Sequence, residues 1–251
     1  CLLGAWRNRQ CAAAFALLPA WSEGNDICVL PAEGSSGVSH NAGKMRLPML
    51  RQQVPGANGC CLSLADYISP VQPAASSDVR NLPPENVLGL FAASFCEADA
   101  AAEAEDEEKY GQMLCQTLKD RLAEATAEKL HEDVRRIYWA YAPEERLAMP
   151  ELFAAKYRGI RPAVGYPSLP DQSIIFLIDR LLPFSQIGVR LTENGMMQPH
   201  ASVAGLMFSH PAAEYFSVGQ IDGSQLADYA ARRGMAQEQL RKYFFRNISS
   251  L

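Results

Sequence analysis

Residues 161–167 (RPAVGYP) carry the clearest candidate for binding chemistry in this chain of 251 residues. A residue before proline is pushed out of the helical region, so Arg161 and Tyr166 are both predicted to be extended. Gly165 permits a turn and a close approach by another group. The loop therefore presents a guanidinium, a phenol and backbone groups on a stiff support. It suits either a small ligand with a carboxylate, which a guanidinium binds through two parallel hydrogen bonds, or a structural ion pair.

A second candidate is a row of carboxylates, Asp120, Glu124 and Glu128, spaced four residues apart on a predicted helix. Like charges at this spacing repel, which water or a cationic partner relieves. The simplest interpretation is an exposed acidic face. Glu128 and His131 also have the spacing of a helix-borne metal-ligand pair, but the chain holds one copy where a di-metal site needs two. We therefore predict no metal site, and a surface position for His131.

A third candidate is the pair Tyr215 and Phe216, shortly after residues 209–211 (SHP). If the pair opens a strand, one ring faces a pocket and the other packs into the core. The chain has no G-x-S-x-G elbow, no P-loop and no G-x-G-x-x-G, which excludes the familiar hydrolase and nucleotide-binding motifs. No catalytic side chain is predicted.

The elements that position these residues follow from hydrophobic periodicity. Strands are predicted over 11–18, 26–30, 86–95, 187–192, 201–208 and 215–221. Helices are predicted over 104–141, 150–157, 174–182, 224–233 and 236–245. The helix near 104–141 is the longest, and Pro143 follows its end. Because strands and helices do not alternate strictly, the pattern favours an α+β fold with a mostly antiparallel sheet, as a single domain over residues 1–251.

Composition excludes several classes of function. The formal net charge is −5, which argues against nucleic acid as a partner. No run of about 18 apolar residues is present, so no membrane span is predicted. Seven cysteines without a C-x-x-C pair are best explained as buried thiols in a reducing cytoplasm, which predicts a cytoplasmic protein.

Three blocks of sequence, taken in order, resemble the activation domain of cobalamin-dependent methionine synthase. That domain is the C-terminal module that binds S-adenosylmethionine. The first block comprises residues 120–125 (DRLAEA), 130–132 (LHE) and 138–143 (YWAYAP), and the second residues 159–167 (GIRPAVGYP). The third comprises 191–194 (LTEN), 201–205 (ASVAG), 208–211 (FSHP) and 215–216 (YF). Residues 50–53 (LRQQ) and 61–67 (CLSLADY) also look like that family.

The resemblance implies a C-shaped domain built on a twisted antiparallel sheet with flanking helices, and a shallow groove for S-adenosylmethionine. By similarity, Arg161 binds the ligand carboxylate and Glu124 binds its amino or hydroxyl groups. The remaining groove residues are, by similarity, Ala163, Gly165, Tyr166, Tyr215 and Phe216. This combination suits a zwitterionic amino acid, and a sulfonium is stabilised beside an aromatic face.

The resemblance also implies an activity. The module belongs to a methyltransferase and is not expected to be active alone. It supports the reductive methylation of inactive cob(II)alamin to methylcobalamin, using S-adenosylmethionine and one electron. The expected partners are the cobalamin-binding domain of the enzyme, which carries the cobalamin, and a flavodoxin-type reductant. Tyr166 and Asp120 are placed to approach that domain.

The sequence departs from the family pattern in places. An Ile-Asp-Trp segment whose Asp contacts S-adenosylmethionine is missing, so we expect the N-terminal part of the domain to be truncated. Gln198 stands where a Trp is common, and residues 171–175 (DQSII) replace a more polar stretch. Two other hypotheses remain open. One is a non-catalytic S-adenosylmethionine-binding sensor or docking module, and the other is an enzyme of unrelated chemistry.

Overall fold

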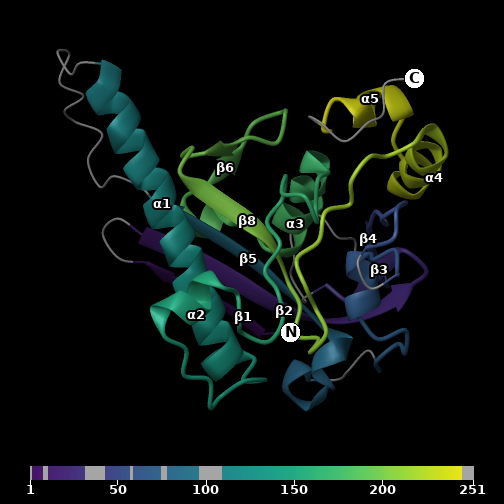
Figure 1. Ribbon diagram of the computed structural model, residues 1–251, viewed down its shortest axis with the longest axis horizontal. Helices are drawn as coiled ribbons and strands as arrows, with labels where there is room; N and C mark the ends of the chain where they lie inside the picture. Colours follow the sequence, from purple (N-terminus) through teal and green to yellow (C-terminus); the bar gives the residue numbers. More distant parts are fainter. Residues whose placement is uncertain are drawn as a thin grey trace.

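The computed structural model describes residues 2–7, 11–31, 43–56, 59–74, 78–95 and 109–244. Its centre is an antiparallel sheet in the order β4-β3-β2-β5-β8, with β1 also paired to β2. Figure 1 shows the sheet curling beneath the long helix α1. The strands are β1 (Leu2–Arg7), β2 (Cys11–Glu23), β3 (Asp26–Val29), β4 (Met45–Pro48), β5 (Val87–Phe95) and β8 (Ser202–Met207). The predicted α+β class with an antiparallel sheet is confirmed.

The long strand β2 joins the two halves of the sheet. Its first part lies between β1 and β5, and its last residues pair with β3 across a tight turn at Gly24 and Asn25. Gly24 has a φ of +62°, a conformation that glycine adopts at little cost. The strands predicted over 11–18 and 26–30 therefore form a hairpin, and β4 occupies the edge position beyond it.

Both faces of β2 and β5 are buried, which explains their almost uninterrupted apolar sequences. Side chains alternate between the faces. Ala13, Phe15 and Leu17 pack toward α1, whereas Ala12 and Ala14 face the core beneath α3. The sheet is thus the middle layer of the domain, with helices on either side.

The helix α1 (Lys109–Asp133) continues through a π-helical turn over Val134–Tyr138. It was predicted over 104–141. Residues 104–108 lie outside the described part, and the helical backbone ends at Tyr138. The small residues Ala123 and Ala127 let the helix approach the sheet closely. Leu130 fills the space between the helix and the sheet. The hydrophobic periodicity that predicted this helix does not mark a buried face in its first half, which extends beyond the sheet (Figure 1). The exposed apolar residues there are Met113, Leu114 and Leu118.

The remaining helices are α2 (Met149–Phe153), α3 (Ile175–Leu181), α4 (Gly223–Arg233) and α5 (Gln237–Arg241). Gly234 ends α4 in a left-handed conformation, which agrees with the end of the helix predicted over 224–233. Residues 187–192 form only the short strand β6 (Arg190–Leu191), paired with β7 (Met197–Gln198). In the part of the chain that is described, no helix is long and apolar enough to cross a bilayer.

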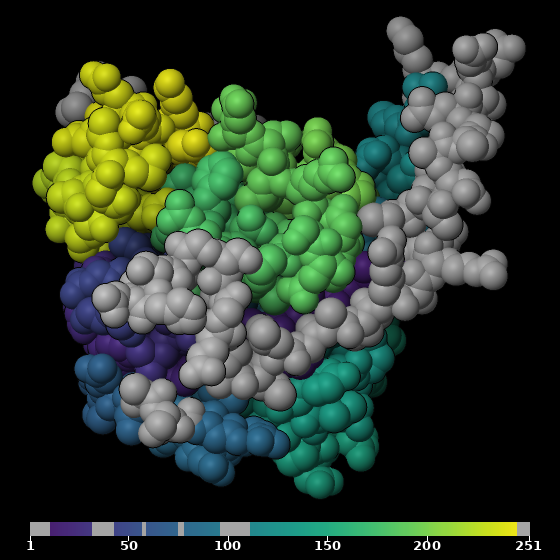
Figure 2. All heavy atoms as spheres, turned by 180° about the vertical axis from the view of Figure 1, so that it is seen from behind, coloured from purple at the N-terminus to yellow at the C-terminus, as the bar shows by residue number. Residues whose placement is uncertain are grey.

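The two C-terminal helices build a small core of their own. Leu226, Tyr229 and Leu240 pack there against Leu50. Seen from behind, this yellow C-terminal part forms a separate corner of the molecule (Figure 2). Arg232 ties it to the sheet, because its Nη1 donates to Asp26 Oδ1 at 2.6 Å. The C-terminal helices therefore lie away from α1 and the loop that follows it.

Candidate functional site

A cleft of about 1060 Å³ lies between α1, α2 and the proline-rich loop. Its walls are residues 121–132 of α1, residues 149–157 in and after α2, the loop 161–168, Val203 of β8, and residues 215–217. In Figure 1, α1 and α2 lie at the same end of the sheet. The cleft thus combines elements that are up to 96 residues apart in the chain.

Backbone pairing with β8 fixes the loop that carries Arg161. Ile160 pairs with Phe208, and Ala163 pairs with Gly205, both in the antiparallel sense. Leu206 N–H donates to the carbonyl of Pro162 at 3.0 Å. Gly205 makes this approach possible, because a Cβ at that position would lie 2.2 Å from the Pro162 oxygen. The loop is therefore a short irregular extension of the sheet, consistent with its predicted stiffness.

Arg161 is held on several sides. Its guanidinium carbon lies 5.1 Å from the centre of the Phe91 ring, and its side chain is 11% exposed. Its Nη2 forms an ion pair with Glu128, and its backbone N–H donates to Tyr215 Oη at 2.9 Å. Its Nε is buried without a hydrogen-bond partner among the described residues. The structural ion pair that the sequence left open is thus present, on the wall of the cleft.

Glu124 lies on the same wall, one turn before Glu128. Its Oε2 accepts a hydrogen bond from Arg121 at 2.7 Å, and its Oε1 accepts one from Tyr166 Oη at 3.2 Å. Burial and the nearby Glu124 carboxylate raise the pKa of Tyr166. Tyr166 therefore stays a neutral hydrogen-bond donor, and it links the loop to the helix across the cleft.

Tyr215 and Phe216 both line the cleft. The predicted strand over 215–221 is wrong, because residues 215–220 are irregular and Ile221 forms an isolated β-bridge and no strand. Hydrogen bonds to the loop hold the segment instead: Ser168 Oγ donates to the Phe216 carbonyl, and the Val218 N–H donates to the Pro167 carbonyl at 2.9 Å.

The side chain of Phe216 packs against the core, with its ring centre 6.4 Å from that of Tyr67, whereas Tyr215 is 46% exposed. One ring of the pair thus packs inward and the other faces outward, as expected. Tyr215 Oη also lies 3.1 Å from Tyr157 Oη.

Of the seven residues proposed from the resemblance, six line this one cleft, and Gly165 lies just outside it. Gly165 has a φ of +86°, and its N–H donates to the Leu169 carbonyl, which closes the loop. The carboxylates of the acidic row are partly exposed, as predicted, but Glu124 and Glu128 have cationic partners. Among the residues described, no group of His, Cys, Asp and Glu is arranged to hold a metal ion.

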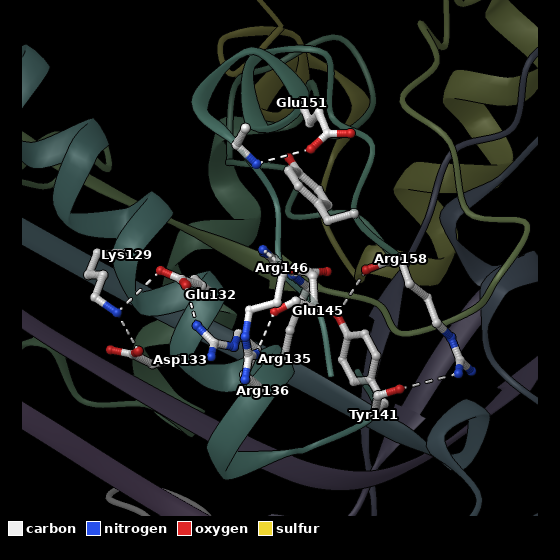
Figure 3. Close-up of polar contacts among 12 residues, drawn as sticks. Lys129, Glu132, Asp133, Arg135, Arg136, Tyr141, Glu145, Arg146, Glu151 and Arg158 are labelled. Atoms are coloured by element: carbon white, nitrogen blue, oxygen red, sulfur yellow. Dashed lines mark hydrogen bonds and ion pairs between the residues drawn. The ribbon is translucent and has the colours of Figure 1, made fainter. Parts of the chain in front are cut away.

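The α2 wall of the cleft was not predicted. Met149 and Phe153 are 60% and 83% exposed and contribute an apolar surface beside the charged loop. Figure 3 shows what supports this region: Arg135, in the π-helical turn, donates to Glu145 from Nε at 2.9 Å. That bond joins two segments ten residues apart in the chain. In the sequence, the one indication of this apolar wall is the spacing of Met149 and Phe153, which lie four residues apart on one face of a helix.

His131 is fully buried, so the predicted surface position is wrong. Its ring packs edge-on against Tyr157 with centroids 5.1 Å apart, and neither ring nitrogen has a described hydrogen-bond partner. Burial, and then the charges of Arg135 and Arg161, lower the pKa of His131 well below its usual value. His131 is therefore a neutral core residue beneath the cleft. The cysteines also differ from prediction, since Cys28 is buried but Cys60 and Cys115 are exposed.

The buried His131 predicts how stability depends on pH. Below about pH 6.5 the unfolded chain binds a proton at this side chain that the folded chain does not, so acid favours unfolding. We expect the free energy of unfolding to fall from pH 7.5 to 5.0 more steeply in the wild type than in His131→Phe. The excess slope reaches at most about 1.4 kcal/mol per pH unit. Urea unfolding at each pH measures this excess slope. Equal slopes in wild type and His131→Phe would contradict the assignment.

The site is that of a small-molecule binding module: a fixed guanidinium, facing carboxylates and aromatic rings gathered at the edge of a curled antiparallel sheet. A family model described as "Vitamin B12 dependent methionine synthase, activation domain" matches residues 4–234. A solved structure, described as the MetH reactivation domain bound to AdoHcy, is 35% identical with a TM-score of 0.79. The match covers 96% of this chain and 71% of that one. The chain belongs to the family of activation domains of vitamin B12-dependent methionine synthase.

Proposed function

We propose that this chain binds S-adenosylmethionine in the cleft and presents its methyl group for the reactivation of cobalamin. The observation that carries the proposal is the shared cleft of Arg161 and Glu124, which come from a loop and a helix 37 positions apart. The AdoHcy in the related reactivation domain supports it, because AdoHcy is S-adenosylmethionine without the transferable methyl group.

The chemistry of the cleft fits this ligand. Arg161 supplies the cation for the ligand carboxylate, and a charged pair of this type is directional and strong. Glu124 supplies an anion for the ammonium group or for ribose hydroxyls. Tyr166, Tyr215 and Phe216 line the same space, and a sulfonium is stabilised beside an aromatic face. We assign the ligand-binding role to these residues together with Ala163, and a loop-shaping role to Gly165.

The chain contributes positioning to the reaction. Cobalamin, carried by the cobalamin-binding domain of the enzyme, supplies the metal chemistry when one electron and one methyl group restore methylcobalamin. The residues of the cleft hold the methyl donor at a fixed place and orientation, which lowers the entropic cost of a reaction between two domains. Charged groups at the rim of the cleft, such as Arg121 and Asp120, are exposed for contact with that domain. The electron donor we propose is a flavodoxin-type protein in the cytoplasm.

The test is a reconstituted reactivation. The chain is mixed with the cobalamin-binding domain holding cob(II)alamin, S-adenosylmethionine and a low-potential reductant, and the absorption spectrum of methylcobalamin is followed. We expect methylcobalamin to form only when the chain and S-adenosylmethionine are both present. Binding of S-adenosylmethionine in calorimetry without any methylation would favour the alternative, a non-catalytic sensor or docking module. Absence of both binding and methylation would contradict the proposed function.

A further inference from the structure

We infer that Glu128 competes with the ligand for Arg161, and thereby sets the affinity of the cleft for the amino-acid end of its ligand. The inference rests on the proposed function, because it concerns the same site. In the structure, Glu128 forms its ion pair with Arg161 at the wall of the cleft. A ligand carboxylate that binds Arg161 must therefore replace the carboxylate of Glu128.

The two partners of this pair are held very differently. The Arg161 side chain is 11% exposed and lies over the Phe91 ring, and Tyr215 fixes its backbone. The Glu128 side chain is 46% exposed on the surface of α1. When the ligand carboxylate replaces Glu128, the guanidinium of Arg161 therefore stays in place and the side chain of Glu128 turns toward solvent. Water can solvate the released carboxylate, so its release is inexpensive compared with the loss of a buried charge.

The geometry of the guanidinium favours the exchange. Glu128 contacts Nη2, whereas Nε has no partner among the described residues. The hydrogens of Nε and Nη2 point to the same side of a guanidinium, where a single carboxylate can accept from both. A ligand carboxylate bound in this way satisfies a donor that the ion pair with Glu128 leaves unsatisfied, and an unsatisfied buried donor is costly.

In this account Glu128 lowers the affinity for the ligand, whereas Glu124 raises it. Glu124 interacts with Arg121 and Tyr166, whereas Glu128 forms the ion pair with Arg161. Removal of the charge at Glu128 weakens the competing ion pair and makes Arg161 more available. A direct contact between Glu128 and the ligand ammonium would instead make the same substitution weaken binding. The sign of the change in affinity therefore separates the two roles.

The experiment is a calorimetric titration of wild type, Glu128→Gln and Asp133→Asn with AdoHcy and with 5′-methylthioadenosine, which lacks the amino-acid end. We expect Glu128→Gln to bind AdoHcy about two- to fivefold more tightly, the range for a partly exposed ion pair. Its affinity for 5′-methylthioadenosine stays unchanged. Asp133→Asn removes one charge from the same helix outside the cleft and controls for net charge.

Several outcomes would overturn the inference. Unchanged or weaker binding of AdoHcy by Glu128→Gln would do so, and so would an equal gain for both ligands. Unfolding in urea checks that the variants retain the wild-type stability, and Glu128→Ala repeats the test without a hydrogen-bonding side chain. If the wild type itself fails to bind AdoHcy, the proposed function fails first. If it binds and only the expected gain is missing, the proposed function stands and the competition is refuted.

Discussion

Replacing Arg161 by alanine weakens AdoHcy binding by about 1.5–3 kcal/mol, which corresponds to a loss of roughly 10- to 150-fold in affinity. This range is that of a hydrogen bond to a charged group in a partly desolvated site. The guanidinium lies on the wall of the cleft, 11% exposed, so solvent screens it less than a surface arginine. Isothermal titration calorimetry measures the change directly.

Two controls make this result specific. The exposed Arg80→Ala removes the same charge from a residue that does not line the cleft and that pairs with its neighbour Asp78, and it leaves the affinity unchanged. Affinity for 5′-methylthioadenosine is also little changed by Arg161→Ala, because that ligand has no carboxylate. Arg161→Lys keeps the charge but loses the two-pronged geometry, and we expect it to fall between the wild type and alanine. An Arg161→Ala variant that binds AdoHcy as well as the wild type would refute the role of Arg161.

Replacing Gly205 by alanine is expected to destabilise the fold by about 2–3 kcal/mol, which exceeds the usual effect of adding one methyl group. The new Cβ would lie 2.2 Å from the carbonyl oxygen of Pro162 and 2.8 Å from the Cα of Ala163. Both are backbone atoms of the loop, so relief requires the loop to move away from β8. Because Arg161 precedes these residues, AdoHcy affinity should fall as well.

Urea denaturation measures the loss, and Gly223→Ala is its matched control. Gly223 begins α4, and a Cβ there has nothing within 4 Å. Alanine also has the higher helix propensity, so this variant should be as stable as the wild type or more stable. A Gly205→Ala protein with wild-type stability and wild-type affinity would show that β8 does not fix the loop.

Local stereochemistry explains what the sequence predicted well. Pro162 and Pro167 restrict the backbone of the residues that precede them, so the loop was predictable without its surroundings. The hairpin of β2 and β3 and the buried strand β5 follow from turn residues and from apolar runs of the right length. Burial of His131 was also predictable, because it lies four residues after Ala127 and three before Val134, on the buried face of α1.

Long-range packing decided the rest. The segment 215–221 has the composition of a strand, but β8 pairs with β5 on one side and with the loop on the other, so neither edge of β8 is open to the segment. The ion pair between Arg161 and Glu128 joins residues 33 positions apart, and no local pattern indicates which of the helix carboxylates meets the guanidinium. The contribution of α2 likewise depends on where the chain returns after the π-helical turn.

A crystal structure of this chain grown with AdoHcy tests the central claim most directly. We predict that the ligand lies in the cleft between α1, α2 and the loop, with its carboxylate accepting from Nε and Nη2 of Arg161 and with Glu128 turned away. AdoHcy bound elsewhere would contradict the account. So would AdoHcy bound with its carboxylate more than about 4 Å from the guanidinium, which is the usual limit for an ion pair.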